Sequence, residues 1–424
     1  MSTQLMERIL SKENLKIAEK AVIANKGSAG IDGMKVEELS KFIEENGQEI
    51  IEKIRNRKYR PSPVKRVQIP KPDGSKRNLG IPSVRDRWLQ QAVYQVLSPI
   101  FEEEFSNSSY GFRPGRRCED AIIKGLELMN DGYDWLVDMD LSKFFDNVNQ
   151  DILMILVHKV IKDPDTESLI RKFLQSGVMV EDVYEETRIG TPQGGNLSPL
   201  LANIYLNEFD RELESRGLRF TRYADDCIIY VRSEMAANRV MKSVTKWLLE
   251  KLQVQVNVTK TKVSRPDGVK YLGFSFYRNS KGIWRPKPHV KSIEKLKAKL
   301  KEYSKRSWSV SMEYRIFKIN PVIRGWVNYF RICDMKGILE KIDRWLRVRL
   351  RMCIWKQWKT PQRREWGLRK LGMNPFWAHV NANSRKGIMA IASSGIMNRT
   401  VTDDTLRLKG FVFLSDHYKL AHKH

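Results

Sequence analysis

The sequence predicts a protein of the α+β class whose C-terminal region is helical and strongly basic, and three observations support this prediction. Two apolar, β-prone runs at 135–139 and 227–231 adjoin acidic residues and are typical of buried strands. Helical patterns lie between and after these runs. From residue 290 onward the pattern is helical, with no evident strand before about residue 410. A chain of 424 residues with 41% apolar side chains has room for more than one domain.

The N-terminal 130 residues are expected to form helices around one β-hairpin. Helices are predicted over 3–24 and about 35–56, and the segment between them is a loop because it packs three glycines into nine positions. Alternating side chains predict a strand over 64–69, and Pro-Asp-Gly-Ser at 72–75 turns the chain back into a second arm. Helices fill much of 83–130.

The middle of the chain interleaves strands and helices. Helical stretches are predicted at about 149–176, 198–216 and 234–252, and the two buried strands lie before and between them. This alternation predicts one sheet-bearing domain. The sequence contains no internal repeat and no low-complexity linker.

The net charge indicates a polyanionic partner. The chain carries a formal net charge of +26, and residues 281–424 hold 33 Lys and Arg against 10 Asp and Glu, which accounts for +23 of it. Such a one-sided excess repels itself unless something neutralises it. Nucleic acid is favoured over an anionic membrane, because the aromatic residues spread over several helices without one amphipathic face. A solvated basic surface without a partner is the remaining alternative.

Other features of the sequence exclude several classes of protein. No run approaches the roughly 20 apolar residues that span a bilayer, and the N-terminus lacks a signal-peptide core, so we expect no membrane contact and a cytoplasmic (bacterial) location. The four cysteines are scattered, form no Cys-x-x-Cys pair and have no clustered histidines nearby. A structural zinc site or a disulfide framework is therefore not expected.

Acidic residues lie at the ends of both predicted buried strands. Asp138 and Asp140 close the first run, and Asp225 and Asp226 precede the second. Adjacent carboxylates among apolar residues repel each other and lose hydration, and a divalent cation relieves both penalties. Hard oxygen ligands without His or Cys select Mg²⁺ or Mn²⁺ over zinc, and a pair of such ions serves phosphoryl transfer. A solvated turn or helix cap is the other interpretation of an isolated Asp-Asp pair.

The motif around the second acidic pair resembles a known family. Tyr-Ala-Asp-Asp at 223–226, in an apolar hairpin, resembles the signature of reverse transcriptases, and the other blocks of that family occur in the right order. The resemblance implies a right-hand polymerase with mostly helical fingers, a palm with a short antiparallel sheet, and a helical thumb. It also implies that Asp140, Asp225 and Asp226 are catalytic and bind two Mg²⁺ ions, with Mn²⁺ as the alternative.

Two further blocks resemble parts of the family's nucleotide site. Phe145 lies five residues after Asp140, and in the family the aromatic residue at this spacing blocks the 2′-hydroxyl of an incoming ribonucleotide. Thr-Pro-Gln-Gly-Gly at 191–195 resembles the next block, whose paired glycines let the backbone approach the nascent base pair closely. The resemblance implies that Gln193 lies beside the nucleotide and the template. An ordinary core position is the alternative for Phe145.

Three cations also have counterparts in the family. Asn-Val-Thr-Lys-Thr at 257–261 resembles the motif after the catalytic hairpin, which implies that Lys260 protonates the departing pyrophosphate; a solvated lysine is the alternative. Residues 69–74 together with Arg77 resemble the fingers hairpin, whose two cations, here Lys71 and Arg77, hold the triphosphate. Tyr-Leu-Gly-Phe at 271–274 resembles the primer-gripping hairpin.

Other motifs narrow the resemblance to the bacterial group II intron maturases, over about residues 5–360. The glycine loop at 25–34 resembles a block of group II intron and non-LTR enzymes, and the sequences at 109–114 and 324–330 resemble maturase motifs. The domains implied are fingers with an N-terminal extension over 1–125, a palm with part of the fingers over 126–280, a thumb or maturase X domain over 281–360, and a basic DNA-binding-like tail over 361–424.

The basic C-terminal third is expected to grip nucleic acid. Arg344, Arg347 and Arg351 share one helical stripe and are the candidate contacts to phosphate. After Trp366 the chain has no cysteine and no His-Asn-His cluster, unlike relatives that end in an HNH endonuclease, so we expect an endonuclease-lacking, IIC-like subtype. The expected partners are an RNA template with a DNA primer, dNTPs, group II intron RNA and target DNA; a homodimer is left open.

The favoured function is an RNA-directed DNA polymerase that also assists splicing and mobility of a group II intron. One alternative is an RNA-binding splicing maturase with little polymerase activity, but decayed maturases commonly lose the two acids of the Tyr-x-Asp-Asp motif, and this chain retains both, at 225 and 226, beside Asp140. The other is an RNA-dependent RNA polymerase, or a host-adapted reverse transcriptase that serves defence. Nucleotide preference distinguishes the RNA polymerase from the favoured function.

Overall fold

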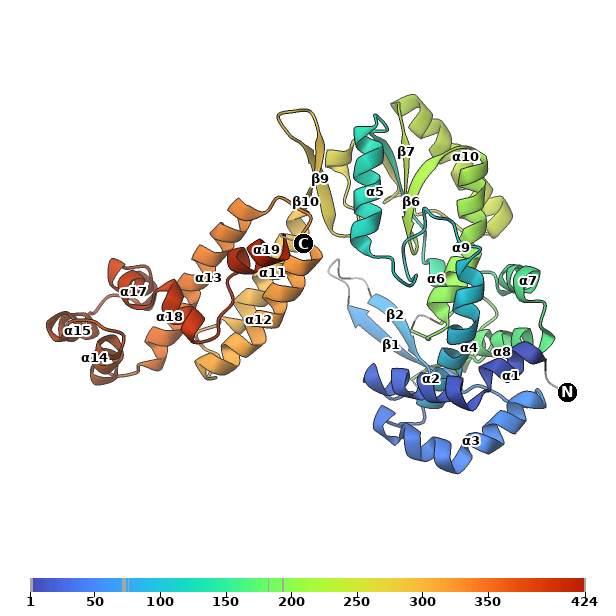
Figure 1. The fold of residues 1–424 in the computed structure, drawn as a ribbon, viewed down its shortest axis with the longest axis horizontal. Coiled ribbons are helices and arrows are strands. Elements are labelled where there is room, and N and C mark those ends of the chain that lie inside the picture. Colours follow the sequence, from blue (N-terminus) through green and yellow to red (C-terminus); the bar gives the residue numbers. More distant parts are fainter. Residues whose placement is uncertain (1–2, 71–73, 75, 182, 193, 423–424) are drawn as a thin grey trace. The chain divides into compact units, whose positions relative to one another are not determined.

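The computed structural model describes residues 3–70, 74, 76–181, 183–192 and 194–422. Its contacts divide the chain into two compact units, residues 1–265 and 266–424, which are described one at a time (Figure 1). The division falls near the expected border between palm and thumb, and the four-domain division stays a prediction.

The first unit begins with helices that pack on one another. They are α1 (Gln4–Ile9), α2 (Lys12–Ala24), a 3-10 turn η1 (Val36–Glu38) and α3 (Leu39–Arg55). The predicted helix over 3–24 is divided because Ser11 caps α2, its hydroxyl accepting from the Asn14 amide at 3.4 Å. The predicted glycine loop is confirmed, and a Cβ atom at Gly30 would lie 2.6 Å from Ser83 Cα, so glycine is needed where this loop meets the chain ahead of α4 (Val84–Glu102).

A four-stranded sheet contains the predicted hairpin. Strand β1 (Val64–Pro70) pairs antiparallel with β2 (Lys76–Ile81) and parallel with β4 (Val178–Val180), and β5 (Val183–Glu185) completes the order β2-β1-β4-β5. The sequence did not predict β4 and β5, because three-residue strands are too short to reveal an alternating pattern.

The second sheet of this unit has the order β6-β7-β3-β8 and is antiparallel throughout. Its strands are β3 (Trp135–Asp140), β6 (Arg219–Tyr223), β7 (Asp226–Val231) and β8 (Lys262–Ser264). Both predicted buried strands, β3 and β7, are therefore confirmed. Val137 and Met139 of β3 join Ile229 of β7 in the main hydrophobic core. The opposite face of β7 carries Tyr230, which packs on Gly125 of α5.

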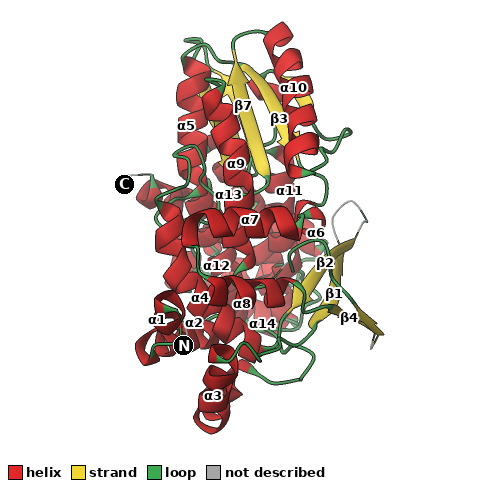
Figure 2. Ribbon diagram, turned by 90° about the vertical axis from the view of Figure 1, so that its right-hand side faces the viewer, coloured by secondary structure: helices red, strands yellow, loops and turns green. Residues whose placement is uncertain are grey.

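Helices cover this sheet and connect it to the hairpin sheet. Figure 2 shows β3 and β7 between α5 (Cys118–Asn130) and α10 (Glu234–Leu252). The other helices of the unit are α6 (Phe144–Asn147), α7 (Gln150–Ile161), α8 (Pro164–Leu174) and α9 (Ser198–Ser215). The helical stretch predicted at 149–176 is two helices, because Asp163 and Pro164 start a new one.

The second unit is mainly helical, as predicted. After a 3-10 turn η2 (Pro266–Gly268), its two strands, β9 (Phe274–Arg278) and β10 (Trp284–Pro288), form a hairpin, and residues 289–422 as described contain no strand. The long helices are α11 (Val290–Tyr303), α12 (Met312–Tyr329) and α13 (Lys336–Gln357). Short helices follow: α14 (Pro361–Lys370), α15 (Pro375–Ala382), α16 (Ile388–Ala392), α17 (Gly395–Thr400), α18 (Asp403–Leu408) and α19 (Leu414–Ala421).

Candidate active site

The hairpin between β6 and β7 brings the predicted aspartates together. Tyr223 pairs with Asp226 across the hairpin, so the connecting loop is Ala224 and Asp225 alone. On the other side of β7, Asp140 at the end of β3 lies directly opposite Asp226 in the antiparallel register. Residues paired in this way have Cα atoms about 4.5–5.5 Å apart. Carboxylates from distant parts of the sequence thus converge at one end of the sheet.

Partial desolvation and mutual repulsion make ionisation of these carboxyl groups costly. Desolvation, followed by the charge of Asp225, raises the pKa of Asp226 to about 7. Desolvation raises the pKa of Asp138 to about 6, although Lys262 opposes this rise. The pKa of Asp225 is also raised by desolvation, and the charge of Arg77 acts against that shift. The cluster therefore favours a bound cation at neutral pH.

The loop at 257–261 is fixed to the backbone of Asp140. The Asn257 amide donates to the Asp140 carbonyl at 2.8 Å, and the Asp140 amide donates to the Thr261 hydroxyl at 3.1 Å. This places the Lys260 ammonium 3.3 Å from a carboxylate oxygen of Asp140. Lys260 therefore lies at the candidate site, in contact with a predicted metal ligand.

The donor chemistry of the cluster fits a divalent cation. Its donors are carboxylate oxygens, the hard ligands that Mg²⁺ and Mn²⁺ prefer. In the described part of the chain, no group of three or more His, Cys, Asp or Glu side chains is arranged to hold a metal ion as it stands. The backbone register therefore supports the predicted ligand set, whereas the side chains do not already form a ligand cage.

A buried ion pair supports the hairpin loop. The side chains of Arg222 on β6 and Asp210 on α9 are both 0% exposed, and the guanidinium binds the carboxylate through two hydrogen bonds of 2.7 and 2.5 Å. Arg222 also donates to the Ala224 carbonyl at 2.9 Å, to the Asn203 side-chain oxygen at 3.1 Å and to the Ser109 hydroxyl at 2.8 Å. One guanidinium therefore connects the loop of Ala224 and Asp225, the candidate catalytic loop, to α9 and to the segment before α5.

The motif at 109–114 packs against the same loop. Ala224 has a φ of +58°, a left-handed conformation that is unfavourable for a residue with a Cβ atom. A Cβ atom at Gly111 would lie 2.2 Å from the Ala224 amide nitrogen, so only glycine permits this approach. The Asn203 amide group donates to the Gly111 carbonyl at 2.8 Å. The sequence indicated the motif but not its contact with the aspartate loop.

Sequence reasoning missed Arg222, Asp210 and Asn203 as supports of the site. A signal was present in the sequence, because the charged Arg222 stands in the run that leads into the Tyr-Ala-Asp-Asp motif, and Asp210 directly follows Phe209 in the helix predicted over 198–216. Charged residues in such positions are expensive unless they are paired.

Tyr223 of the hairpin lies beside a cysteine at the start of α5. Desolvation and a hydrogen bond with the Cys118 thiol raise the pKa of Tyr223 to about 12. The other three cysteines, Cys227, Cys333 and Cys353, are buried.

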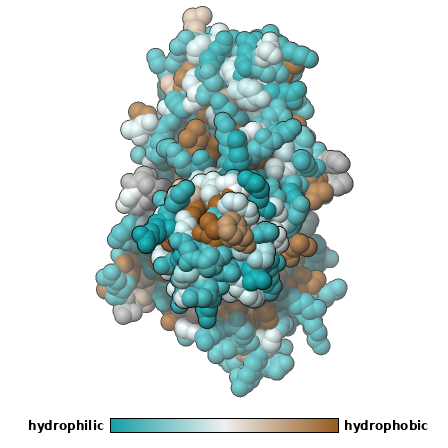
Figure 3. Space-filling view, turned by 90° about the vertical axis from the view of Figure 1, so that its left-hand side faces the viewer, coloured by the Kyte–Doolittle hydropathy of each residue, from teal (hydrophilic) through white to brown (hydrophobic). Residues whose placement is uncertain are grey.

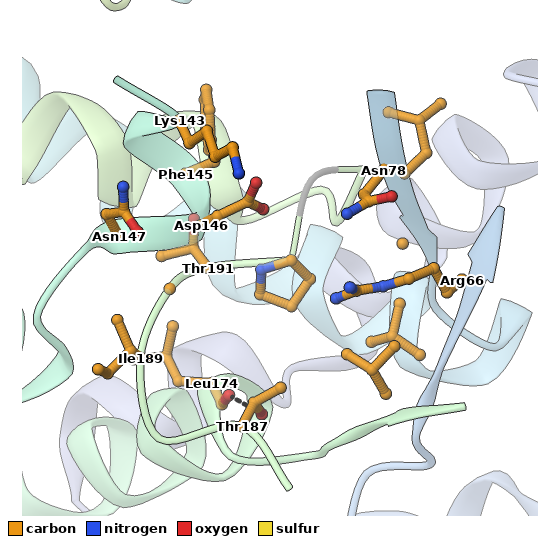
Figure 4. A pocket seen from close by; sticks show the side chains of 16 residues that line it. Arg66, Asn78, Lys143, Phe145, Asp146, Asn147, Leu174, Thr187, Ile189 and Thr191 are labelled. Atoms are coloured by element: carbon orange, nitrogen blue, oxygen red, sulfur yellow. Dashed lines mark hydrogen bonds between the residues drawn. The ribbon is translucent and has the colours of Figure 1, made fainter. Parts of the chain in front are cut away.

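A cavity of about 340 Å³ adjoins Phe145. Figure 4 shows Arg66 and Asn78 of the β1–β2 hairpin pointing into it from one side, with Asp146 and Thr191 on the other. Phe145 lines the cavity and is itself buried, in edge contact with the ring of Phe144. Arg66 and Asn78 were not predicted as site residues. Pairing of β1 with β2 is what brings them to one face, and that pairing becomes visible only in the folded hairpin.

Two predicted nucleotide contacts, Lys71 and Gln193, lie outside the described residues. Arg77 is on β2, and its charge acts on Asp225. The glycine next to Gln193 is described: a Cβ atom at Gly194 would lie 2.5 Å from the Gly80 carbonyl oxygen of β2. Glycine is therefore needed at this position for packing on β2, and the approach of the paired glycines to the nascent base pair stays a prediction.

Comparison with known proteins identifies the family. Residues 69–276 match the family described as reverse transcriptase (RNA-dependent DNA polymerase), and residues 293–372 match the group II intron, maturase-specific domain. Protein YkfC of Escherichia coli K12 is 32% identical over 317 residues, which cover 65% of this chain and 83% of YkfC. The chain belongs to the group II intron reverse transcriptases.

Other relatives of this group II intron reverse transcriptase are longer. Group II intron-encoded protein LtrA of Lactococcus lactis subsp. cremoris is 37% identical over 227 residues, which cover 53% of this chain and 38% of LtrA. The match therefore spans well under half the length of LtrA. Among solved structures, a chain of the partial Cas6-RT-Cas1–Cas2 complex is 26% identical with a TM-score of 0.37, over 58% of this chain and 43% of that one.

The matched domains divide the candidate residues of this group II intron reverse transcriptase. The reverse transcriptase match contains all predicted catalytic and nucleotide contacts, from residue 71 to residue 260. The maturase-specific match contains the three arginines of α13. No helix of the described residues is long and apolar enough to cross a membrane.

The three arginines predicted to bind nucleic acid have different environments. Arg351 is buried, and its guanidinium donates to the Val401 carbonyl at 3.0 and 2.8 Å. Arg347 is half-buried and binds the Asp403 carboxylate at 2.9 Å. Arg344 is exposed. Two of the three guanidinium groups therefore anchor the segment at 398–403 to α13, and only Arg344 has the exposed side chain that phosphate contact requires.

Proposed function

We propose that this protein copies RNA into DNA at the carboxylate cluster of Asp140, Asp225 and Asp226. The observation that carries the proposal is the register of the second sheet, which sets Asp140 opposite Asp226 at the end of the two-residue catalytic loop. The membership of the chain in the group II intron reverse transcriptases supports the same reaction.

In the proposed reaction, the 3′-hydroxyl of a DNA primer attacks the α-phosphate of a dNTP and pyrophosphate departs. The three aspartates would hold two Mg²⁺ ions, or Mn²⁺ in their place, which when bound activate the attacking oxygen and stabilise the leaving one. Lys71 and Arg77 hold the triphosphate, and Gln193 lies beside the base pair being formed. Lys260 delivers a proton to the departing pyrophosphate.

Phe145 selects deoxyribonucleotides in this proposal. Its ring borders the cavity lined by the β1–β2 hairpin and by residues that follow Asp140 closely along the chain, and we expect it to meet a 2′-hydroxyl there. Replacing Phe145 by Ala should let the enzyme incorporate rNTPs on an RNA template, measured by primer extension with each nucleotide set. A wild-type enzyme that already uses rNTPs equally would favour an RNA-dependent RNA polymerase.

The main test is primer extension on an RNA template with dNTPs, with and without Mg²⁺. Asp225→Asn should abolish extension while affinity for the template–primer persists, because the substitution removes a metal ligand and no basic residue. Asp131→Asn, which changes an exposed carboxylate at the end of α5, is the matched control and should extend at the wild-type rate. Extension by Asp225→Asn at a near wild-type rate would contradict the assignment.

A second role, assistance to intron splicing and mobility, is proposed on two grounds. Residues 293–372 match the maturase-specific domain, and the surrounding C-terminal third holds most of the net charge. The protein should lower the Mg²⁺ concentration at which its group II intron RNA self-splices; no change in that concentration would remove the role. Target DNA is the partner proposed for the tail at 361–424, and the bacterial cytoplasm is the proposed location.

A further inference from the structure

The second unit exposes three large aromatic side chains on two short helices. Trp366 of α14 and Phe376 and Trp377 of α15 have 61%, 66% and 57% of their surface exposed. Figure 3 faces this end of the unit and shows an apolar patch ringed by hydrophilic residues. These three residues are called the aromatic surface below. Rings of this size rarely stay uncovered by chance when several lie close together in sequence and fold.

The aromatic surface is not the seam that joins the two helices. In α15 the buried residues are Ala378 and Ala382, which at 100° per residue lie on the face opposite the two exposed rings. In α14 a Cβ atom at Gly367 would lie 2.4 Å from the ring of Trp358, so that face is already packed. Both helices therefore meet their packing needs on other faces.

Positive charge surrounds the aromatic surface. Residues 356–402 contain nine Lys and Arg but one acidic residue, Glu365. The carboxylate of Glu365 lies 2.9 Å from the His379 ring nitrogen. The Lys370 ammonium lies 4.9 Å from the centroid of the Trp366 ring. Several cations of this region have exposed side chains: Arg363, Arg369, Lys370, Arg385 and Lys386.

A hollow lies along the exposed side of α14. Its volume is about 590 Å³, and its lining residues are Gln362, Glu365, Trp366, Arg369 and Lys370. Exposed rings beside cations and a polar hollow suit a nucleic-acid strand, because its flat bases can stack on the rings while its phosphates bind the cations. A protein partner would need no such excess of cations.

We propose that the aromatic surface stacks unpaired bases of an RNA strand, while the neighbouring cations hold the phosphates of that strand. The bases must be unpaired, because a duplex covers the faces of its own bases. RNA is the chosen strand because Trp366 of α14 lies within the match to the group II intron maturase-specific domain, which ends at residue 372, just before α15. This choice of strand departs from the target DNA proposed above for the tail at 361–424. The site goes beyond the proposed polymerase function, since it uses none of the three aspartates.

The test is the affinity of the full chain for a single-stranded RNA of about 16 nucleotides without internal pairing, measured by fluorescence anisotropy over a range of salt concentrations. The assay contains a template–primer duplex at saturating concentration, so that the polymerase site is filled and the single strand binds elsewhere. The double variant Phe376→Ala with Trp377→Ala should bind about tenfold more weakly or worse. The salt dependence of the double variant's RNA affinity should equal that of the wild type, because stacking releases no counterions.

Three control variants separate stacking from other effects. Met389→Ala removes an exposed apolar side chain of α16 that is not aromatic, and its affinity should be that of the wild type. Lys386→Ala should lower the slope of log affinity against log salt by about one, since it removes a phosphate contact. Asp225→Asn should bind the strand like the wild type even though it abolishes extension. Extension therefore tests the polymerase assignment, and affinity for the single strand tests the stacking proposal independently.

Four outcomes would overturn the proposal. The first is an unchanged RNA affinity of the aromatic double variant when its melting temperature is that of the wild type. The second is an equal loss of affinity for paired and unpaired RNA, and the third is a loss of affinity confined to a DNA strand of the same sequence. The fourth is a shift in oligomeric state, measured by light scattering, without any loss of RNA affinity. The DNA outcome would instead support the predicted DNA-binding tail. Ultraviolet crosslinking of the RNA to the peptide that contains Phe376 and Trp377 gives a second, independent readout, and its absence counts against stacking.

Discussion

The carboxyl group of Asp226 is in an unfavourable environment in the metal-free protein. Its side chain is exposed at the end of β7 but partly desolvated, and it faces the charges of Asp225, Asp138 and Asp140; together these effects raise its pKa to about 7. Because the folded state binds this proton more tightly than the unfolded state, the stability it contributes is fully present below pH of about 4 and is lost as the pH rises through about 7.

Asp226→Asn should therefore stabilise the metal-free protein at pH 8 by about 1–2 kcal/mol, less than the full pKa shift implies because water screens this exposed side chain, and leave its stability nearly unchanged at pH 4. The amide replaces a charge crowded by neighbouring carboxylates at the higher pH and a neutral acid at the lower one. Unfolding by urea in EDTA at both pH values measures the difference, with Asp131→Asn as the exposed control. An equal difference in the free energy of unfolding between variant and wild type at pH 4 and pH 8 would contradict the pKa assignment. Adding Mg²⁺ should narrow this difference at pH 8.

In the proposed reaction, we expect Arg222 to act through the conformation of the loop formed by Ala224 and Asp225, because it donates to the Ala224 carbonyl. Removing it would leave Asp210 charged and buried, at a cost of about 3–5 kcal/mol, so a smaller change is more informative. Asn203→Ala removes the side chain that joins Arg222 to the Gly111 carbonyl. It should lower kcat for extension about tenfold or more with little change in KM for dNTP, because a misplaced loop impairs chemistry more than binding.

Asn207→Ala is the matched control for that variant. Asn207 is one turn further along α9 and also makes two hydrogen bonds: it accepts from the Ser106 amide and donates to the Glu104 carbonyl, but it makes none to the loop of Ala224 and Asp225. Both variants should lose similar stability in a thermal melt, while kcat falls in Asn203→Ala alone. An equal fall of kcat in both would mean that Asn203 has a structural role and does not position the loop.

At the scale of single elements, helix α13 combines one exposed arginine with two that bind its own unit. Arg344→Ala should lower the salt slope of RNA binding by about one without changing the melting temperature. Arg351→Ala should leave the slope unchanged and destabilise the protein by about 1–3 kcal/mol, because the buried Val401 carbonyl loses its donor. Salt titrations and thermal melts of the two variants measure both quantities. A lower stability of Arg344→Ala together with a lower salt slope of Arg351→Ala would contradict the environments described for these arginines.

Elements with strong periodicity were predictable from the sequence, and those that depend on partners were not. Strands β3 and β7 and helix α10 follow the predicted ranges because burial imposes their patterns locally. The hairpin of β9 and β10 was not predicted as strands: Pro286 and Pro288 lack the amide hydrogen that an inner strand needs, but β10 pairs with β9 alone among the described residues. A two-stranded sheet tolerates them.

The same distinction holds for the candidate site. Asp140, Asp225 and Asp226 were predictable because each adjoins a strand and belongs to a motif with fixed spacing. The partners Arg222 and Asp210 were not, because a local pattern does not say which buried acid pairs with which buried base. Arg347 and Arg351 share a helical stripe with Arg344, but spacing alone does not reveal that the later segment at 398–403 covers two of them.

At the scale of the whole molecule, charge is divided unequally along the chain. Residues 281–424 hold +23 of the net +26, and residues 1–280 hold the remaining +3. A fragment of residues 1–265, which is one compact unit, should therefore show a salt slope for RNA binding less than half that of the full chain. Filter binding over a salt series measures the slopes, and circular dichroism checks that the fragment is folded. Equal slopes would mean that the C-terminal third makes few phosphate contacts.

The arrangement of the cysteines has a practical use. Three of the four thiols are buried, and burial raises the pKa of each, so they are poor nucleophiles. Cys118 is the accessible one, and it hydrogen-bonds the tyrosine of the catalytic hairpin. A maleimide dye should therefore attach at this position in the native sequence, without engineering, and report by its emission when template and nucleotide engage the neighbouring loop.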